Sequence, residues 1–210
     1  WWPDPSSKNG LPYIRKDGEV NPEVGNYPDK QNMPRVCEKV YEFSLAFYLS
    51  GNETYAKKAR ALVHTWFLDT ATKMNPNVNY GQAVKGVVEG RGEGLIDTRH
   101  FIFLLDGVQL LNKYKSWSTN NNNELKIWFK AYYDWLDNSK IGKDEKKASN
   151  NHGVWYDAQA LAITNFLGDD ASSKKIINRA SHDYVKIEIK NFTHNTYIRG
   201  PKRELTPTFA

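Results

Sequence analysis

The segment Ser149–Tyr156 gathers side chains that can act on a sugar: two carboxamides, an imidazole, an indole and a phenol. An apolar helix is predicted to follow it as far as Leu167. At helical spacing, one face of that helix carries His152, Trp155, Tyr156 and Gln159. The opposite face is expected to pack in the core and carries Val154, Ala158, Leu161 and Ala162. The first face suits a charged sugar, with Asn150 and Asn151 beside it. The alternative is an Asn N-cap followed by a buried histidine and tryptophan.

A second polar segment, Met74–Gln82, lies in a long loop between predicted helices. Amides and phenols hydrogen-bond to sugar hydroxyls, which makes Asn79, Tyr80 and Gln82 candidates for substrate binding. The alternative is an Asn/Pro/Gly turn stabilised by its own side chains. The length of the loop, about 28 residues, favours the binding interpretation.

The same loop ends in a glycine-rich stretch, Glu89–Gly94. No strand precedes it and no Gly-Lys-Ser/Thr follows, so a nucleotide site is not indicated. The glycines are instead interpreted as letting the backbone pass close to another segment. Arg91 and Arg99 are then available to pair with a substrate carboxylate. A salt bridge from Arg91 to a neighbouring glutamate is the alternative.

No metal or cofactor site is expected. The histidines lack the spacing of metal ligands, and Cys37 is the only cysteine, expected to be buried and inert. The mixed-charge run Lys143–Lys147 is interpreted as a solvated loop. Near the end of the chain, Arg199 and Arg203 lie close to a tyrosine and can either bind an acidic polymer or be merely exposed.

The composition limits the classes of protein to which this chain can belong. The 210 residues, 40% hydrophobic, fit one globular domain. Seven Trp, twelve Tyr and nine Phe exceed what a core alone suggests, and sugar rings pack on flat side chains. A net charge of +5 favours a polyanionic partner. Nucleic acid, acidic polysaccharide and an anionic membrane all satisfy the charge, and among them we expect an acidic polysaccharide and no nucleic acid. No membrane partner is expected, because there is neither a long apolar run nor a basic amphipathic helix. The oligomeric state is left open.

The periodicity of apolar residues is helical after a Pro/Gly-rich arm, residues 1–33. Helices are predicted over 34–49, 52–68, 97–114, 122–136, 153–167 and 171–190. Gly51 and Gly168 mark two tight turns, so successive helices are expected to form three hairpins with the long loops at one end. We predict an all-α fold, an incomplete (α/α) toroid in a single domain over 1–210. It consists of the arm, hairpins over 34–191 and a C-terminal segment over 192–210. Both ends of the chain are expected to be trimmed.

Five ordered motifs resemble the alginate-lyase superfamily of polysaccharide lyases over most of the chain. They are Trp1–Pro5, Asn9–Gly18, Asn75–Gln82, Gly90–Gly92 with Ile96–Arg99, and Asn150–Asp157. The resemblance implies an (α/α) toroid and metal-free β-elimination on a uronic-acid polymer. It assigns to Asn151 the neutralisation of the substrate carboxylate, and to His152 the role of base or neutraliser. The family's late Arg and catalytic Tyr are not matched, because Pro207 stands where the Arg is expected. Tyr80, Tyr156 and Tyr197 are stand-ins for the acid.

We therefore expect a lyase acting on an alginate- or glucuronan-like polymer. A non-catalytic protein that binds acidic carbohydrate and an α/α-barrel glycoside hydrolase are the alternatives. The hydrolase requires paired acids, for which Glu93, Asp97 and Asp157 are the candidates. The arm and the loop 69–96 are predicted to lie at the same rim as His152. Two glycosylation sequons, at Asn52 and Asn191, favour a secreted protein.

Overall fold

The structure, a computed structural model, describes residues 1–181 and is built of helices. Within this range, strand-like pairing is confined to two isolated bridges, Trp2 with Ile14 and Val84 with Val88. The all-α prediction is confirmed. The helical elements are η1 (Pro22–Asn26), α1 (Asp29–Ser50), α2 (Glu53–Val63), η2 (His64–Leu68), η3 (Gly92–His100), α3 (Phe101–Leu110), η4 (Leu111–Lys113), α4 (Thr119–Asn138), α5 (Lys140–Lys146), α6 (Asn151–Leu167) and a last helix over 170–181.

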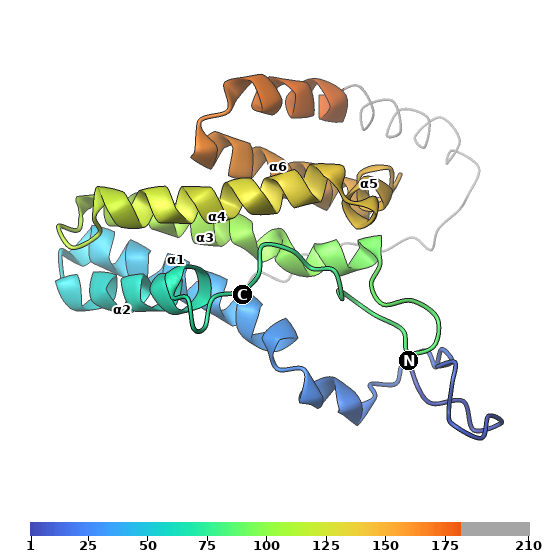
Figure 1. The fold of residues 1–210 in the computed structure, drawn as a ribbon. Coiled ribbons are helices and arrows are strands. Elements are labelled where there is room, and N and C mark those ends of the chain that lie inside the picture. Colours follow the sequence, from blue (N-terminus) through green and yellow to red (C-terminus); the bar gives the residue numbers. More distant parts are fainter. Residues whose placement is uncertain (182–210) are drawn as a thin grey trace, which may run out of the picture.

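The long helices form three hairpins, as predicted: α1 with α2, α3 with α4, and α6 with the helix over 170–181 (Figure 1). Their tight turns lie together on the left of Figure 1, and the long connections and the N-terminal arm lie on the right. The candidate binding segments are therefore gathered at one end of the helical stack.

The tight turns form where local sequence signals are strong. Gly51 and Gly168 end α1 and α6 with φ of 70° and 78°, a left-handed conformation that favours glycine. Asn52 then caps α2, its side chain accepting a hydrogen bond from the backbone N–H of Thr54 at 3.0 Å. Ser118 and Asn121 form a reciprocal capping box at the start of α4. These turns fix the antiparallel order of the helices.

Three predicted boundaries are wrong. Helix α1 begins at Asp29, and Pro34 lies inside it, because buried Met33 already packs in the core one residue before the proline. The end of the expected loop 69–96 is helical, since η3 starts at Gly92 and leads directly into α3. The stretch 140–149 is not all loop, because α5 occupies Lys140–Lys146 and the Ser139 side chain caps it.

The aromatic surplus is mostly core. Around Phe67, the rings of Phe101, Trp128 and Phe129 pack edge-to-face or stacked, with centroids 4.8–5.9 Å apart. Tyr132 completes this cluster by stacking on Trp128 at 5.6 Å. The predicted burial of Cys37 is confirmed, and burial raises the pKa of its thiol. The abundance of aromatic residues therefore reflects packing between hairpins more than sugar binding.

Helices α1 and α3 approach closely at Gly107, where a Cβ atom would lie 2.8 Å from the Cα atom of Tyr41. Gly107→Ala is expected to destabilise the protein by about 1–3 kcal/mol, because the two helices must separate to admit the methyl group. Chemical denaturation would measure this loss. Gly25→Ala is the matched control, since a Cβ at Gly25 meets nothing within 4 Å. An unchanged midpoint for Gly107→Ala would contradict the tight packing.

Several expectations fall outside the described residues. They are the end of the helix predicted over 171–190, the C-terminal segment 192–210, Tyr197, Arg199 and Arg203. Within residues 1–181, no helix is both long and apolar enough to span a membrane.

Candidate active site

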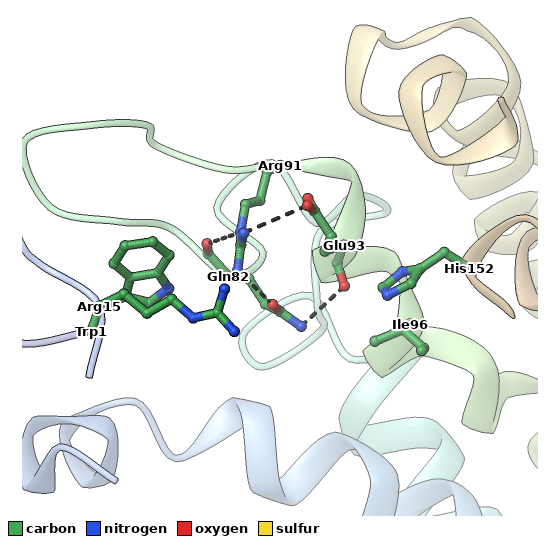
Figure 2. Close-up of a pocket in the computed structure, with 7 residues that line it drawn as sticks. All are labelled: Trp1, Arg15, Gln82, Arg91, Glu93, Ile96 and His152. Carbon is green, nitrogen blue, oxygen red and sulfur yellow. Dashed lines mark hydrogen bonds and ion pairs between the residues drawn. The ribbon is translucent and has the colours of Figure 1, made fainter. Parts of the chain in front are cut away.

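A cleft of about 430 Å³ opens at the end of the stack where the long connections lie. Its lining comes from three separate parts of the chain (Figure 2): Trp1 and Arg15 of the arm, Gln82, Arg91, Glu93 and Ile96 of the loop and η3, and His152 of α6. The prediction that the arm and the loop share a rim with His152 is confirmed.

His152 occupies the first turn of α6. Asn150 is the N-cap, its Oδ1 accepting a hydrogen bond from the backbone N–H of His152 at 3.0 Å. The predicted capping role of an asparagine is thus confirmed, but the His152 side chain is not buried in the core. Its exposed fraction is 21%, and the ring points into the cleft (Figure 2).

The Nδ1 atom of His152 lies 2.6 Å from Oε1 of Glu145. Glu145 is on α5 and only 3% exposed. Burial raises the pKa of its carboxyl group above the ordinary value, while the hydrogen bond with His152 acts in the opposite direction. When Glu145 is ionised it can only accept, so Nδ1 of His152 carries a proton, and in the neutral ring Nε2 has the free lone pair. This arrangement prepares His152 to take a proton from a group in the cleft.

Glu145 is one of the candidate site residues that the sequence interpretation missed. The run Lys143–Lys147 was interpreted as a solvated loop, which is wrong for Glu145. Its burial depends on Gly92, where a Cβ atom would lie 3.2 Å from Oε2 of Glu145. The glycine therefore lets the loop backbone cover the carboxylate. The one signal available in the sequence was a glutamate seven residues before the histidine.

Arg91 forms the loop side of the cleft. Its Nε donates to the carbonyl oxygen of Gln82 at 3.1 Å, and its Nη2 donates to Oε1 of Gln82 at 3.0 Å. Nη1 lies 3.6 Å from Glu93, so the salt-bridge alternative also holds. The guanidinium is 5.7 Å from the ring centre of Trp1. Arg91 is thus held in place with part of its cation facing the cleft.

The glycines around Arg91 bring its loop into close contact with an earlier one. A Cβ at Gly90 would overlap the carbonyl group of Asn79, and a Cβ at Gly94 would lie 2.5 Å from the carbonyl carbon of Gly81. Only glycine fits such contacts. The interpretation of this stretch as a close backbone approach is confirmed, and it explains how Gln82 and Arg91 come together.

The arm adds a second cation that was not among the expected site residues. Arg15 lies in the motif Asn9–Gly18, lines the cleft beside Trp1, and pairs with Asp17 at 2.6 Å. Two guanidinium groups and a histidine therefore face the same space, with Glu93 as the one acid among the described lining residues. Such a cleft is suited to a carboxylate-bearing ligand.

The sequence model of the alginate lyase family matches residues 1–190. The chain belongs to this family. Among solved structures, it is similar to the crystal structure of an alginate lyase from Bacteroides ovatus, with 38% sequence identity and a TM-score of 0.82. The match covers 87% of this chain and 48% of that one, so the chain spans about half the length of its solved relative. The comparison with curated proteins finds no match.

Membership in the alginate lyase family agrees with the toroid predicted from the hairpins.

Two predictions for side chains on α6 are wrong. Tyr156 is 1% exposed and its hydroxyl lies 3.4 Å from the carbonyl oxygen of Leu136, so it faces the core and not the cleft. Gln159 is also buried and bonds to Thr98 at 2.8 Å. Val154, expected in the core, is exposed.

Two more residues that were predicted to bind substrate, Tyr80 and Asn79, lie outside the cleft lining. Tyr80 is 75% exposed and lines a separate shallow depression with Val84 and Val87. Asn79 accepts a hydrogen bond from Trp135 Nε1 at 2.8 Å, which anchors the loop. Their predicted roles in substrate binding and catalysis gain no support from this placement.

Asn151, Arg99 and Trp155 lie near the cleft without lining it. Asn151 is exposed in the first turn of α6, directly before His152. Arg99 donates to the carbonyl oxygen of Ile96 at 2.7 Å, and its guanidinium lies 5.9 Å from the ring centre of Trp155. Asn151 and Arg99 therefore adjoin His152 and Ile96, which do line the cleft.

The acids that a glycoside hydrolase would need are not paired across the cleft. Asp157 is buried against Arg179, and Asp97 lies 3.9 Å from Lys30. Of the three candidates, Glu93 alone lines the cleft. Within residues 1–181, no cluster of three or more His, Cys, Asp or Glu side chains is placed to hold a metal ion.

Proposed function

We propose that the protein is a polysaccharide lyase that cleaves a uronic-acid polymer, alginate- or glucuronan-like, by β-elimination. The observation that carries the proposal is the His152–Glu145 pair at a cleft that also holds two arginines. Family membership supports the reaction class, and the activity remains a proposal because the chain spans 48% of its solved relative.

The first step is removal of the proton on C5 of the uronate. Nε2 of His152 accepts this proton, and the Glu145 carboxylate stabilises the imidazolium that results. Because Glu145 is buried, its charge is little screened by water. The Glu145–His152 pair thus supplies both the base and its orientation.

Loss of the C5 proton adds negative charge beside a carboxylate that is already ionised. Arg91 and Arg15 face the cleft and can bind that carboxylate, and Asn151 can donate its amide hydrogens from the start of α6. The proposed mechanism uses these protein groups alone, and no metal or cofactor is assigned to it.

The second step breaks the bond between C4 and its glycosidic oxygen while a C4–C5 double bond forms. An acid returns a proton to the departing oxygen. Tyr80 and Tyr156 lie outside the cleft lining, so we do not assign this role to them. Tyr197, Arg199 and Arg203 lie outside the described residues, and we retain them as candidates for the acid and for substrate binding.

We further propose that the protein is secreted, because a polymeric substrate is met outside the cell. The exposed Asn52 lies between α1 and α2, and the turn that joins these helices is at the end of the stack opposite the long connections (Figure 1). A glycan on its Nδ2 would leave Oδ1 free to cap α2.

The test is a screen of the protein against alginate, glucuronan, pectate and hyaluronan. A lyase makes a 4,5-unsaturated product, so ultraviolet absorbance is expected to rise with at least one uronate polymer. Reducing ends without a rise in absorbance would indicate a hydrolase. Polymer retention without either signal would indicate a binding protein.

A further inference from the structure

The N-terminal arm, which ends at residue 28 because α1 begins at Asp29, reaches the cleft without belonging to the hydrophobic core. In the part of the chain that the structure describes, the first core residue is Met33. The arm nevertheless supplies Trp1 and Arg15 to the cleft. Something other than apolar burial must therefore hold these two side chains in place.

The arm is a unit held together by its own backbone. Trp2 and Ile14 exchange both of their backbone hydrogen bonds, at 2.8 and 2.9 Å, so Trp1 and Arg15 project from neighbouring points. The Asn21 side chain donates to the carbonyl oxygen of Trp1 at 2.9 Å. Any displacement of the arm would consequently remove both cleft residues together.

A polar cluster, which we call the Tyr13–Glu23–Lys85 clamp, attaches the arm to the loop in addition to the Trp1–Arg91 contact. Lys85 Nζ lies 2.8 Å from Glu23 Oε2, and the Tyr13 hydroxyl donates to the same carboxylate at 2.8 Å. The Tyr13 backbone N–H donates to the carbonyl oxygen of Lys85 at 2.9 Å, and the Lys85 ammonium lies 5.2 Å from the Tyr13 ring centre. The hydrogen bond from Lys85 and that from Tyr13 lower the pKa of Glu23, so both contacts favour its ionised form.

Close packing beside the clamp fixes the register of the two segments. A Cβ at Gly86 would lie 3.0 Å from Cα of Pro12, and Gly86 has a φ of 77°. In Figure 1 the arm, in dark blue, and the green loop lie side by side on the right of the molecule.

The loop itself is anchored to the helices. Trp128 Nε1 donates to the carbonyl oxygen of Met74 at 2.8 Å, and Trp135 Nε1 donates to Asn79 at 2.8 Å. The loop thus serves as a fixed support for the arm.

We propose that Tyr13, Glu23 and Lys85 are positioning residues whose contact determines how tightly the cleft binds an acidic polymer. The clamp positions Arg15 and Trp1 opposite His152, and it contacts neither His152 nor Glu145. This inference rests on the proposed function for its kinetic consequence, but the seating of the arm can be measured without any activity.

The test is a charge reversal. Glu23→Lys places two ammonium groups together and releases the arm. Polymer binding is expected to weaken by roughly tenfold, because a charge-assisted contact from Arg15 is lost. Long-range electrostatics alone predicts the opposite, since this variant is more positive than the parent. Lys85→Glu is expected to weaken binding similarly, and the double variant Glu23→Lys/Lys85→Glu is expected to recover most of it at the parent net charge.

Three measurements separate the outcomes. KM should rise in each single variant, and kcat should fall far less than the ~10²–10⁴-fold that loss of a positioned base costs, because His152 and Glu145 lie on other elements. Hydrogen exchange at the Tyr13 amide should speed up in the single variants and slow again in the double variant. Affinity electrophoresis on alginate should follow the same order.

Lys130→Glu is the matched control, because it reverses the lysine of an exposed ion pair on α4 without contacting the arm. Slow exchange at Tyr13 in both single variants would overturn the clamp. Fast exchange with unchanged polymer binding would overturn its link to affinity. If no polymer is cleaved, the proposed function fails, yet exchange and electrophoresis still decide the inference.

Discussion

His152→Ala is expected to lower the rate of elimination by about 10²–10⁴-fold, the usual cost of losing a positioned proton acceptor. The His152 side chain borders the cleft and contributes little to the core, so the helical circular dichroism should persist. Ultraviolet absorbance of the unsaturated product measures the rate. His64→Ala, an exposed histidine of η2 outside the cleft lining, is the control.

The same substitution leaves Glu145 buried without its partner, so a stability loss of about 1–3 kcal/mol is expected where the carboxylate is ionised. The loss should depend on pH. Glu145 has a pKa raised above 4.5, so the stability associated with its neutral form is complete below pH 4.5 and is lost as the pH rises through the raised value. The melting temperatures of parent and variant should therefore converge in acid. Complete unfolding of His152→Ala at every pH would indicate a structural histidine, and parental activity would place the chemistry elsewhere.

Glu145→Gln is expected to lower kcat/KM by about 10²-fold while preserving the fold. The amide can still accept the hydrogen bond from Nδ1, but it carries no charge to stabilise the imidazolium. A neutral amide also avoids the cost of burying a charge, so thermal stability near neutrality should not fall.

The control is Asp144→Asn, which removes a charge from an exposed neighbour on the same helix. Equal activity of Glu145→Gln and the parent would show that the buried carboxylate serves packing only. A loss of activity together with a lower melting temperature near neutrality would indicate a distorted helix α5 and not an electrostatic role.

The order of hairpins could be predicted from sequence because the tight turns have local signals. Gly51 and Gly168 adopt left-handed backbone angles that few other residues accept, and Asn52 caps the following helix. Pro34 misled the prediction of the first helix, since proline is typical of a helix start yet here lies inside one. Strong local chemistry thus gave the architecture, and its exact limits depended on packing.

The candidate site was predicted only in part, because some of its properties depend on distant segments. The cleft position of His152 followed from its place at a helix start. The face of α6 did not, since α6 packs against α3, α4, α5 and η3, and its buried polar groups find partners such as Thr98. The burial of Glu145 depends on Gly92 and its hydrogen bond depends on His152, and the sequence does not show that either residue lies beside it.

The two walls of the cleft differ in origin. One wall carries the Glu145–His152 pair on helices that share the core, whereas the other carries Arg15 on an arm outside it. Substitutions in the arm are therefore freed from the constraint of filling a close-packed interior. Polymer preference can diversify by exchange of this segment while the Glu145–His152 pair stays constant. A chimaera that takes residues 1–28 from another member of the alginate lyase family would test this expectation.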